Sequence, residues 1–450
     1  MLVNRWLVVV MLFGWQGRVH AEDLSLPLSA ELTDRLEQGA RAVQDKVVAW
    51  RRDLHLHPEL SNREFRTAAL VAEHLRSLGL EVTTGVAHTG VVGYLRGRSE
   101  HPLVALRADM DALPVTEQVD VPFASRVRSQ YLGQEVGVMH ACGHDNHIAM
   151  LMGAAEVLAG VADQIPGSIK FIFQPAEEGP PEGEAGGAKL MVDQGVLQDV
   201  DAIFGLHVFP TPLGTVQYRE GGIMASSDSF RINVKGAQTH GAVPWGGVDP
   251  IVVAAQIVLG LQTIPSRQLD STLTPSIVTV GKINGGVRAN IIPAEVEMLG
   301  TIRTFEESVR QDIHRRITRT AKMIAESAEA TADFQLLSGT PVTTNDPILT
   351  RSMVPTLERV VGQDRVSISP RTTTAEDFSY YQQKVPGLFL FLGVANPQDP
   401  SPAPNHSPYF YADERALPVG VKLLTHLAVD YLIKAEREMP ALNDHHENTP

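Results

Sequence analysis

Apolar runs typical of buried strands alternate with helical runs, and this alternation constrains the fold more than any other feature of the chain. Leu103–Leu106 and Ile169–Phe173 have the length and apolar character of buried strands, and Ile148–Val161 between them has the pattern of a helix. Each of the two strands leads into a polar loop. This order predicts an α/β sheet whose loops at the strand ends carry the chemistry.

Length and a change of pattern predict two domains. A chain of 450 residues exceeds the size at which one hydrophobic core usually stops growing. Residues 223–335 contain two strand–helix units and predict an inserted α+β module. We therefore expect a first domain formed by residues 31–222 and 336–436, interrupted by this module and followed by a polar tail at residues 437–450.

The charge of the chain excludes some partners. Its 52 acidic residues outnumber 38 basic residues, for a net charge of -14. Such a balance argues against a nucleic-acid-binding surface and against attraction to anionic lipid. The charge says nothing sharper about partners, and the small-molecule substrate expected below comes from the family resemblance.

The N-terminus predicts export. Arg5 precedes an apolar run from Trp6 to Trp15, and small residues around Ala21 provide a cleavage site, so residues 1–21 are interpreted as a signal peptide. The run is short for a membrane anchor, which is the alternative, and no later segment has the unbroken apolar length of a span. The mature protein is expected in the periplasm or outside the cell, with no membrane span.

The segment Met139–His147 concentrates three histidines, one cysteine and one aspartate just before a helix. Cys142 and His144 are two positions apart, so on an extended segment they project to one side, where a thiolate and an imidazole can share metal ions. The alternative is a buried cysteine beside capping and solvated polar residues. Cys142 is the only cysteine of the chain, which rules out an intrachain disulfide.

Acidic residues follow both buried strands. Glu177 and Glu178 are adjacent, so on an extended segment their side chains point in different directions and take different tasks. One carboxylate can bind metal while the other accepts a proton from the attacking water and returns it to the leaving nitrogen. Asp109 and Asp111 are spaced by two, and either one is a ligand or a carboxylate that orients a ligand.

His207 follows an apolar stretch, and His406 lies in a loop after a proline-rich stretch. Each histidine alone is more often an ordinary polar residue than a ligand. Their combination with the cysteine and the carboxylates predicts a metal site.

These residues resemble the aminoacylase and carboxypeptidase-type metallopeptidases, and among them the N-acyl-amino-acid amidohydrolases such as hippurate hydrolase and indole-acetyl-amino-acid hydrolases. The resemblance runs from about Val48 to Lys434. It rests on nine ordered motifs: His55-Leu56-His57-Pro58-Glu59-Leu60, Arg107-Ala108-Asp109-Met110-Asp111-Ala112-Leu113-Pro114, Met139-His140-Ala141-Cys142-Gly143-His144-Asp145, Gln174-Pro175-Ala176-Glu177-Glu178-Gly179, Gly205-Leu206-His207, Asn290-Ile291-Ile292-Pro293, Gly300-Thr301-Ile302-Arg303-Thr304-Phe305, Ala375-Glu376-Asp377-Phe378 and Asn405-His406-Ser407-Pro408.

The resemblance implies a catalytic α/β domain with a mixed sheet, an inserted lid or dimerisation domain, and two divalent metal ions, which can be Zn, Mn, Ni or Co. Cys142 takes the bridging position, with four further ligands: His144, Glu178, His207 and His406. Glu177 is the general base, and Asp111 resembles the residue that orients a ligand. Asp109 stands where other branches use a histidine ligand, a function that we assign to His144.

In the inserted module the resemblance implies that His240 stabilises the oxyanion, while Asn290 and Arg303 hold the carboxylate of the substrate. The alternatives are a turn residue for Asn290 and a surface cation for Arg303. Two departures from the family pattern, Asn146 for a glycine and Trp245 for a histidine, do not touch the predicted ligands. Trp245 is close to His240 in sequence and is expected to reshape the acyl pocket.

The implied function is hydrolysis of the amide bond of N-acyl amino acids, such as hippurate-like compounds, to a carboxylic acid and an amino acid, by attack of a metal-activated water. Dimerisation through the inserted module is expected. One alternative is a dipeptidase or carboxypeptidase of the same architecture. Another is a non-catalytic solute-binding protein with a cleft between two domains.

Overall fold

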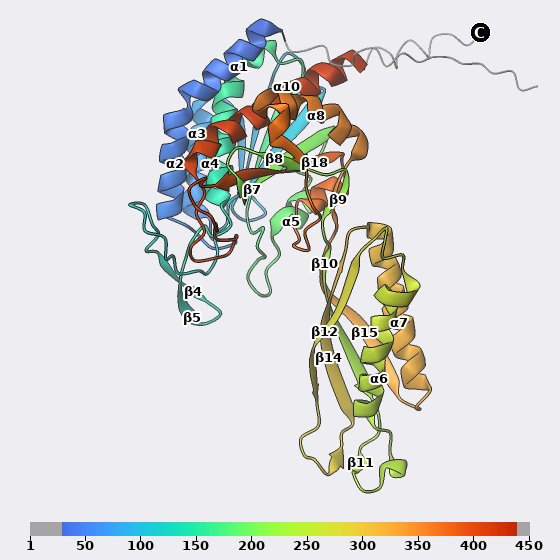
Figure 1. Ribbon diagram of the computed structural model, residues 1–450. Coiled ribbons are helices and arrows are strands. Elements are labelled where there is room, and N and C mark those ends of the chain that lie inside the picture. The colour runs from blue at the N-terminus through green and yellow to red at the C-terminus, as the bar shows by residue number, and fades with distance from the viewer. Residues whose placement is uncertain (1–28, 439–450) are drawn as a thin grey trace, which may run out of the picture.

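The computed structural model describes residues 29–438, so the predicted signal peptide at residues 1–21 and the tail beyond residue 438 lie outside the described part. The larger domain is built on an eight-stranded sheet (Figure 1). In spatial order its strands are β1 (Glu81–Val86), β2 (Gly90–Leu95), β6 (Ser168–Gln174), β3 (Leu103–Asp109), β7 (Ala202–Pro212), β18 (Gly387–Ala395), β8 (Val216–Tyr218) and β17 (Val366–Ile368).

The sheet is mixed, as predicted. Strands β6, β3, β7 and β18 run parallel to their neighbours in this central group, whereas β1 with β2, β2 with β6 and β18 with β8 pair antiparallel. Val104 and Leu106 of β3 belong to the core on one face of the sheet, and Leu103 and Ala105 belong to the core on the other. Burial on both faces explains the unbroken apolar run in the sequence.

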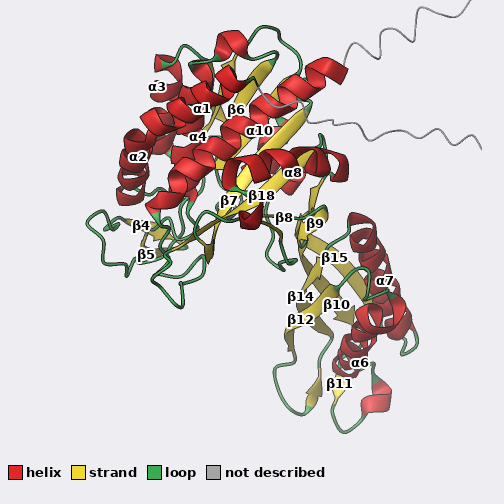
Figure 2. Cartoon of the chain, turned by 45° about the horizontal axis from the view of Figure 1, so that its top comes forward, coloured by secondary structure: helices red, strands yellow, loops and turns green. Residues whose placement is uncertain are grey.

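Helices cover both faces of this sheet (Figure 2). The larger layer consists of α1 (Ala30–Ala42), α2 (Gln44–Leu56), α3 (Phe65–Ser77), α4 (His144–Ala159), α8 (Pro347–Val361) and α10 (Leu417–Glu438). Two shorter helices, α5 (Gly187–Asp193) and α9 (Ser379–Gln382), belong to the core on the opposite face. A hairpin of β4 (Arg128–Tyr131) and β5 (Gln134–Gly137) projects from the domain.

Within residues 29–438, one helical stretch, Glu414–Glu438, is long and apolar enough to cross a membrane by length and composition alone. However, 67% of its most apolar window is buried, and α10 contacts α4 and α8. It is therefore a core helix of the larger domain.

The inserted domain has its own core and a four-stranded antiparallel sheet in the order β12 (Ser276–Gly285), β14 (Glu295–Thr304), β10 (Ser227–Lys235) and β15 (Thr331–Thr340). Helices α6 (Pro250–Thr263) and α7 (Glu307–Glu326) pack on this sheet. A small pair, β11 (Thr239–His240) and β13 (Ile291–Ile292), lies at the end remote from the larger domain (Figure 1).

The two domains are joined by two chain segments. Strand β9 (Gly221–Met224) leads to β10, and β15 leads back to β16 (Thr343–Asn345), which pairs with β9. The predicted α+β insertion is confirmed, while its predicted bounds at residues 223 and 335 stay a prediction. The strands of its sheet span residues 227–340.

Candidate metal centre

The structure brings the five predicted ligand residues into one cluster at the carboxyl ends of the central parallel strands. Cys142 Sγ lies 3.3 Å from His207 Nε2 and 3.2 Å from His406 Nε2. Glu178 Oε1 lies 3.0 Å from His406 Nε2. Cys142 and His144 also form a group with His207 whose ligand atoms all lie within 4.8 Å of one another. Parallel strands end at a common edge of the sheet, which explains why residues far apart in sequence meet here.

Gly143 sets the angle between Cys142 and His144. Its φ of +94° is in the left-handed region, and a Cβ at this position would lie 2.3 Å from Val208 Cγ2. Only glycine tolerates both this conformation and this close approach to β7. The glycine therefore lets α4 begin at His144 directly behind the cysteine.

Two of the histidines are oriented by main-chain carbonyls. His144 Nδ1 lies 2.8 Å from the carbonyl oxygen of Asp111, and His207 Nδ1 lies 2.8 Å from that of Val208. The Nε2 atom of His144 is buried and has no hydrogen-bond partner. Donation from Nδ1 leaves Nε2 free as a ligand atom, which is the arrangement of metal-binding histidines. The set of thiol, imidazole and carboxylate groups thus fits a divalent metal of the Zn, Co or Ni type.

The cluster carries an excess of negative charge. Burial and the nearby Glu376 and Glu178 raise the pKa of Glu177 well above its usual range, although its side chain is 9% exposed. Burial, with Glu178 and Glu177, also raises the pKa of the Cys142 thiol. Burial lowers the pKa of His144, but Asp109 and Asp111 outweigh it and raise that pKa to about 10. A divalent cation would reverse these directions, because it favours the deprotonated form of every group around it.

Asp111 holds the loop that carries the two glutamates. The backbone N–H groups of Glu177 and Glu178 each donate to its carboxylate at 3.0 Å, and the hydroxyl of Ser61 donates to it at 2.7 Å. His144 Nδ1 is closer to the Asp111 carbonyl, at 2.8 Å, than to its carboxylate, at 3.4 Å. The catalytic role of Asp111 stays a prediction.

Asp109 and His147 form a second buried group, for which the sequence left several roles open. Asp109 Oδ1 lies 2.6 Å from His147 Nδ1, and Asp109 Oδ2 accepts from Arg107 at 2.6 Å. His147 Nε2 accepts the N–H of Val208 at 2.8 Å. Both carboxylate oxygens of Asp109 and both ring nitrogens of His147 therefore have partners within the protein. We interpret this pair as a support of β7 at Val208, next to His207, rather than as a metal site. The sequence signal for this group was the spacing of His144 and His147, because residues three apart are neighbours on the surface of a helix.

Sequence reasoning assigned no role to Arg107, Glu376 and Asp377. The Arg107 guanidinium is buried and lies 2.9 Å from Glu376 Oε1 and 3.0 Å from Asp377 Oδ1. A charged residue inside an otherwise apolar strand was a signal that this position needs a buried partner.

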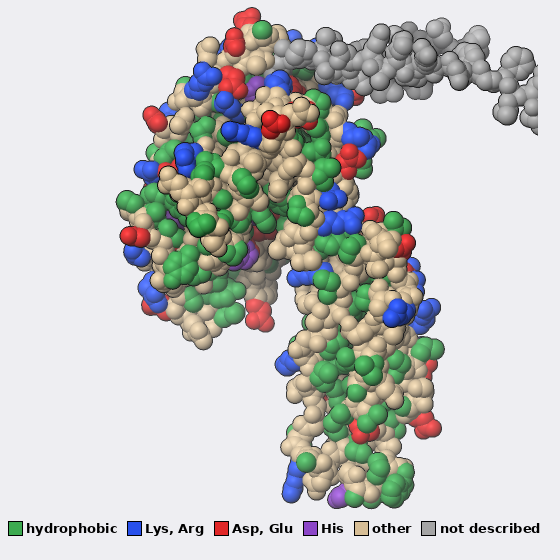
Figure 3. Space-filling model, in the orientation of Figure 1, with side chains coloured by type: hydrophobic (Ala, Val, Ile, Leu, Met, Phe, Trp, Pro, Cys, Tyr) green, Lys and Arg blue, Asp and Glu red, His purple; other side chains and the backbone are tan. Residues whose placement is uncertain are grey.

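The three residues predicted to bind substrate from the inserted module do not lie in the cluster. His240, on β11, and Asn290, just before β13, are exposed at the remote end of this domain, and Trp245 nearby is 82% exposed. Arg303 is on β14, where burial lowers its pKa. Figure 3 shows open space between the remote end and the larger domain. Their roles in substrate binding stay predictions.

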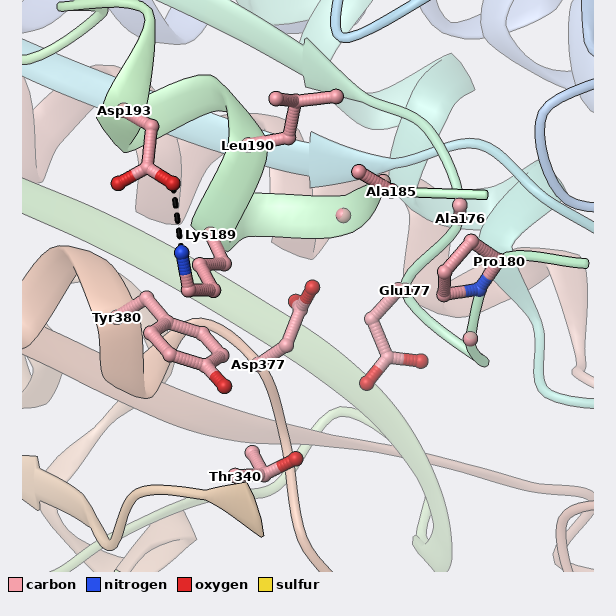
Figure 4. A pocket seen from close by; sticks show the side chains of 13 residues that line it. Ala176, Glu177, Pro180, Ala185, Lys189, Leu190, Asp193, Thr340, Asp377 and Tyr380 are labelled. Atoms are coloured by element: carbon pink, nitrogen blue, oxygen red, sulfur yellow. Dashed lines mark hydrogen bonds and ion pairs between the residues drawn. The ribbon is translucent and has the colours of Figure 1, made fainter. Parts of the chain in front are cut away.

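A hollow of about 280 Å³ lies beside Glu177. Its walls come from the loop after β6, from α5 and from the junction with the inserted domain, and its polar lining includes Glu177, Lys189, Asp193, Thr340, Asp377 and Tyr380. In Figure 4 the side chains of Glu177, Asp377, Tyr380 and Thr340 surround a common space, with the Lys189–Asp193 ion pair of 2.6 Å at one side. A reactant in this hollow would contact Glu177 and both domains.

Three curated relatives are similar to most of the chain. Thermostable carboxypeptidase 2 of Saccharolobus solfataricus is 40% identical over 89% of this chain and 99% of its own length. N-acetylcysteine deacetylase of Bacillus subtilis is 38% identical over 86% of this chain and 97% of its own length. IAA-amino acid hydrolase ILR1-like 4 of Arabidopsis thaliana is 39% identical over 87% of this chain and 86% of its own length. These names support the predicted class of enzyme, a hydrolase acting on linear amides.

The predicted export is contradicted by these comparisons. The matches cover 99% of the carboxypeptidase and 97% of the deacetylase, so what remains of each relative is too short for a leader of the length of residues 1–21. These two relatives therefore offer no counterpart of a signal peptide. The expectation of a periplasmic or secreted enzyme was wrong, because a basic residue, a short apolar run and small residues after it do not by themselves identify a leader.

A solved structure and a family model agree with the relatives. The structure of Bacillus subtilis YXEP protein, described as a dinuclear metal binding peptidase from the M20 family, superposes with a TM-score of 0.73 at 35% identity, over 88% of this chain and 99% of that one. The model of peptidase family M20/M25/M40 matches residues 105–430. The resemblance predicted from the motifs is thus confirmed, and the chain belongs to peptidase family M20/M25/M40.

Proposed function

We propose that the protein is a metal-dependent amidohydrolase that cleaves N-acyl amino acids to a carboxylic acid and an amino acid. The observation that carries this proposal is the place of Glu177, a largely buried carboxylate that lies between the cysteine–histidine cluster and the hollow. The names of two relatives, an N-acetylcysteine deacetylase and an IAA-amino acid hydrolase, support a substrate of this class.

Two divalent metal ions are proposed as cofactors, held by Cys142, His144, Glu178, His207 and His406. When bound, they supply Lewis acidity to the amide carbonyl and to the attacking water. The proposal is supported by the free, buried Nε2 of His144 and by the dinuclear site named for the similar Bacillus subtilis structure.

Glu177 is proposed to move the proton. Its Oε2 atom lies 3.9 Å from His144 Nε2, at the edge of the cluster, and its side chain also lines the hollow. It takes a proton from the attacking water while the new C–O bond forms, and it gives that proton to the leaving nitrogen when the C–N bond breaks.

The inserted module is proposed to bind a second copy of the chain. Support comes from the exposed apolar side chains of α6, of which Ile251 is 47%, Val252 53% and Leu259 71% exposed, and from β12, an edge strand of the sheet. His240 is proposed to stabilise the oxyanion, and Asn290 and Arg303 to hold the substrate carboxylate, after a movement or an assembly that brings the module to the hollow. Light scattering of the purified protein tests the dimer, and a monomer would contradict it.

A carboxypeptidase or dipeptidase is the second candidate, favoured by the name of the Saccharolobus solfataricus relative. The two candidates differ in the group before the scissile bond, an acyl group without an amine or a free amino acid. Side-by-side assays of hippurate-like, acetyl and long-chain acyl amino acids against free dipeptides, with added Zn or Mn, separate them. Turnover restricted to the peptides would contradict our first choice.

The base assignment is tested with Glu177→Gln. We expect turnover to fall by about 10²- to 10⁴-fold with unchanged metal content, because the variant loses the proton acceptor and no ligand. Glu182→Gln, an exposed carboxylate of the same loop, is the matched control and should keep normal activity. Hydrolysis by Glu177→Gln at the normal rate would refute the assignment.

A further inference from the structure

Buried carboxylates accept hydrogen bonds from three consecutive backbone N–H groups of the loop after β6, those of Ala176, Glu177 and Glu178, which we call the acidic loop. Glu177 and Glu178 donate to Asp111, as described above, and Ala176 donates to Glu64 Oε1 at 2.9 Å. Glu64 comes from a separate segment, directly before α3. The loop is therefore fixed from two sides, by Asp111 at the end of β3 and by Glu64.

Glu64 is itself held firmly. Its side chain is fully buried, and its Oε1 also accepts the N–H of Asn62 at 3.0 Å. Its Oε2 accepts the hydroxyl of Thr89, in the turn between β1 and β2, at 2.5 Å. These contacts join three segments of the larger domain to one carboxylate, and none of them involves a proposed metal ligand.

The backbone that Glu64 holds is in an unfavourable conformation. Ala176 has a φ of +52°, in the left-handed region that residues with a Cβ rarely adopt, and its side chain is buried. Such a conformation persists only where its surroundings enforce it. Ala176 directly precedes Glu177, so its conformation sets the direction in which the Glu177 side chain leaves the loop.

We propose that Glu64 is a positioning residue for amide hydrolysis, which aims the Glu177 carboxylate through its hydrogen bond to the Ala176 N–H. The proposal rests on the proposed function, in which Glu177 moves the proton. Asp111 restrains the two residues that follow Ala176 but not Ala176 itself. Without Glu64, Ala176 can relax toward an ordinary φ, and the Glu177 carboxylate would shift relative to the cluster and the hollow.

The test measures kcat, KM, metal content and folding of the metal-loaded enzyme with Glu64→Gln. An amide keeps the size of the side chain but is a weaker acceptor than a carboxylate, which weakens the hydrogen bonds to Ala176 and Asn62. We expect kcat to fall by about 10-fold or more, because a misplacement of about 1 Å can cost about 10²-fold, while KM and metal content stay within about twofold. Thr89→Val removes one hydroxyl donor and should lower kcat by a few-fold; it decides the question if Glu64→Gln does not fold.

Glu59→Gln is the matched control. Glu59 also accepts two backbone N–H groups at the start of α3, from Arg66 at 3.0 Å and Thr67 at 2.8 Å, but its side chain makes no hydrogen bond to the acidic loop. This variant should keep normal kcat. An equal loss in Glu59→Gln and Glu64→Gln would show a general effect on the fold and would overturn the proposal.

A double-mutant cycle separates positioning from a structural role. In a Glu177→Asp background, whose shortened carboxylate is already misplaced, Glu64→Gln should lower kcat much less than in the normal enzyme. Full additivity would overturn the proposal, as would normal kcat in folded Glu64→Gln and Thr89→Val, or a loss of kcat that follows a loss of metal. Normal activity of Glu177→Gln would instead refute the proposed function on which the proposal rests.

Discussion

Replacing Arg107 by methionine should destabilise the larger domain, and more at high pH than at low pH. Arg107 is 2% exposed, and its guanidinium donates to Asp109 at 2.6 Å on one side. On the other side it donates to Glu376 at 2.9 Å and Asp377 at 3.0 Å. Methionine fills a similar volume but leaves these three buried carboxylates without their common cation.

We expect the unfolding free energy to fall by about 3–5 kcal/mol, because this is the cost of removing one partner of a buried ion pair. The pH dependence follows from the carboxyls. Burial raises the pKa of Glu376 to about 8 and that of Asp377 to about 6, although Arg107 lowers both. Without Arg107 both values rise further, and each unit adds about 1.4 kcal/mol of differential stability. A folded-state pKa above the unfolded value means that stability is lost as the pH rises through it. The deficit should therefore grow from pH 6 to pH 8.5.

Urea unfolding followed by circular dichroism at pH 6 and pH 8.5, with the same metal present, measures this deficit. Arg98→Met is the control, because its ion pair with Glu436, of 2.8 Å, is exposed. It should change the unfolding free energy by about 1 kcal/mol or less at either pH. A deficit below about 1 kcal/mol for Arg107→Met, or a deficit of equal size at both pH values, would refute the reasoning.

Three further predictions concern the metal centre and one buried histidine. Cys142→Ser replaces a soft sulfur ligand, so dialysed protein should retain less Zn by elemental analysis, and full retention would contradict the ligand role. His147→Leu removes the acceptor of the Val208 N–H and no proposed ligand, and it should weaken metal affinity by about 10- to 100-fold in a competition titration; unchanged affinity would count against this support. Burial and Arg359 lower the pKa of His426 to about 4, below its unfolded value, so stability should fall by about 2 kcal/mol between pH 7 and pH 5 through this group. His426→Gln should reduce that fall, and an unchanged pH dependence of unfolding would exclude the effect.

The larger domain could be predicted well because its signals are local. The predicted strands Leu103–Leu106 and Ile169–Phe173 are β3 and β6, each with only a few added residues at its ends. The predicted helix Ile148–Val161 starts earlier, at His144, because the left-handed Gly143 allows the chain to turn into α4 at that point. An apolar pattern cannot predict a helix end that depends on one backbone angle.

The supporting contacts of the centre could not be predicted in the same way. Arg107 and Glu376 are 269 residues apart, and nothing in their local sequence says that they pair. The same holds for Glu64 and Ala176, which are 112 residues apart. Such pairs arise from the order of strands and loops in space, whereas the proposed ligands lie in short local motifs that the sequence itself marks.

In the inserted domain, the sequence motifs do not predict where their residues lie relative to the metal centre. Its two connections to the larger domain are short, between β9 and β10 and between β15 and β16, and Tyr380 donates to the Gly339 carbonyl at 2.6 Å beside them. The hollow at this junction has Thr340 on one wall and Glu177 on another, so rotation of the module changes the space next to the proposed base. The proposed role of His240 would need such a rotation or a second copy of the chain, because His240 is exposed at the remote end of the module. Amide chemistry is therefore readable from the motifs of the larger domain, whereas the proposed substrate contacts of the module would need a domain arrangement that no local pattern encodes.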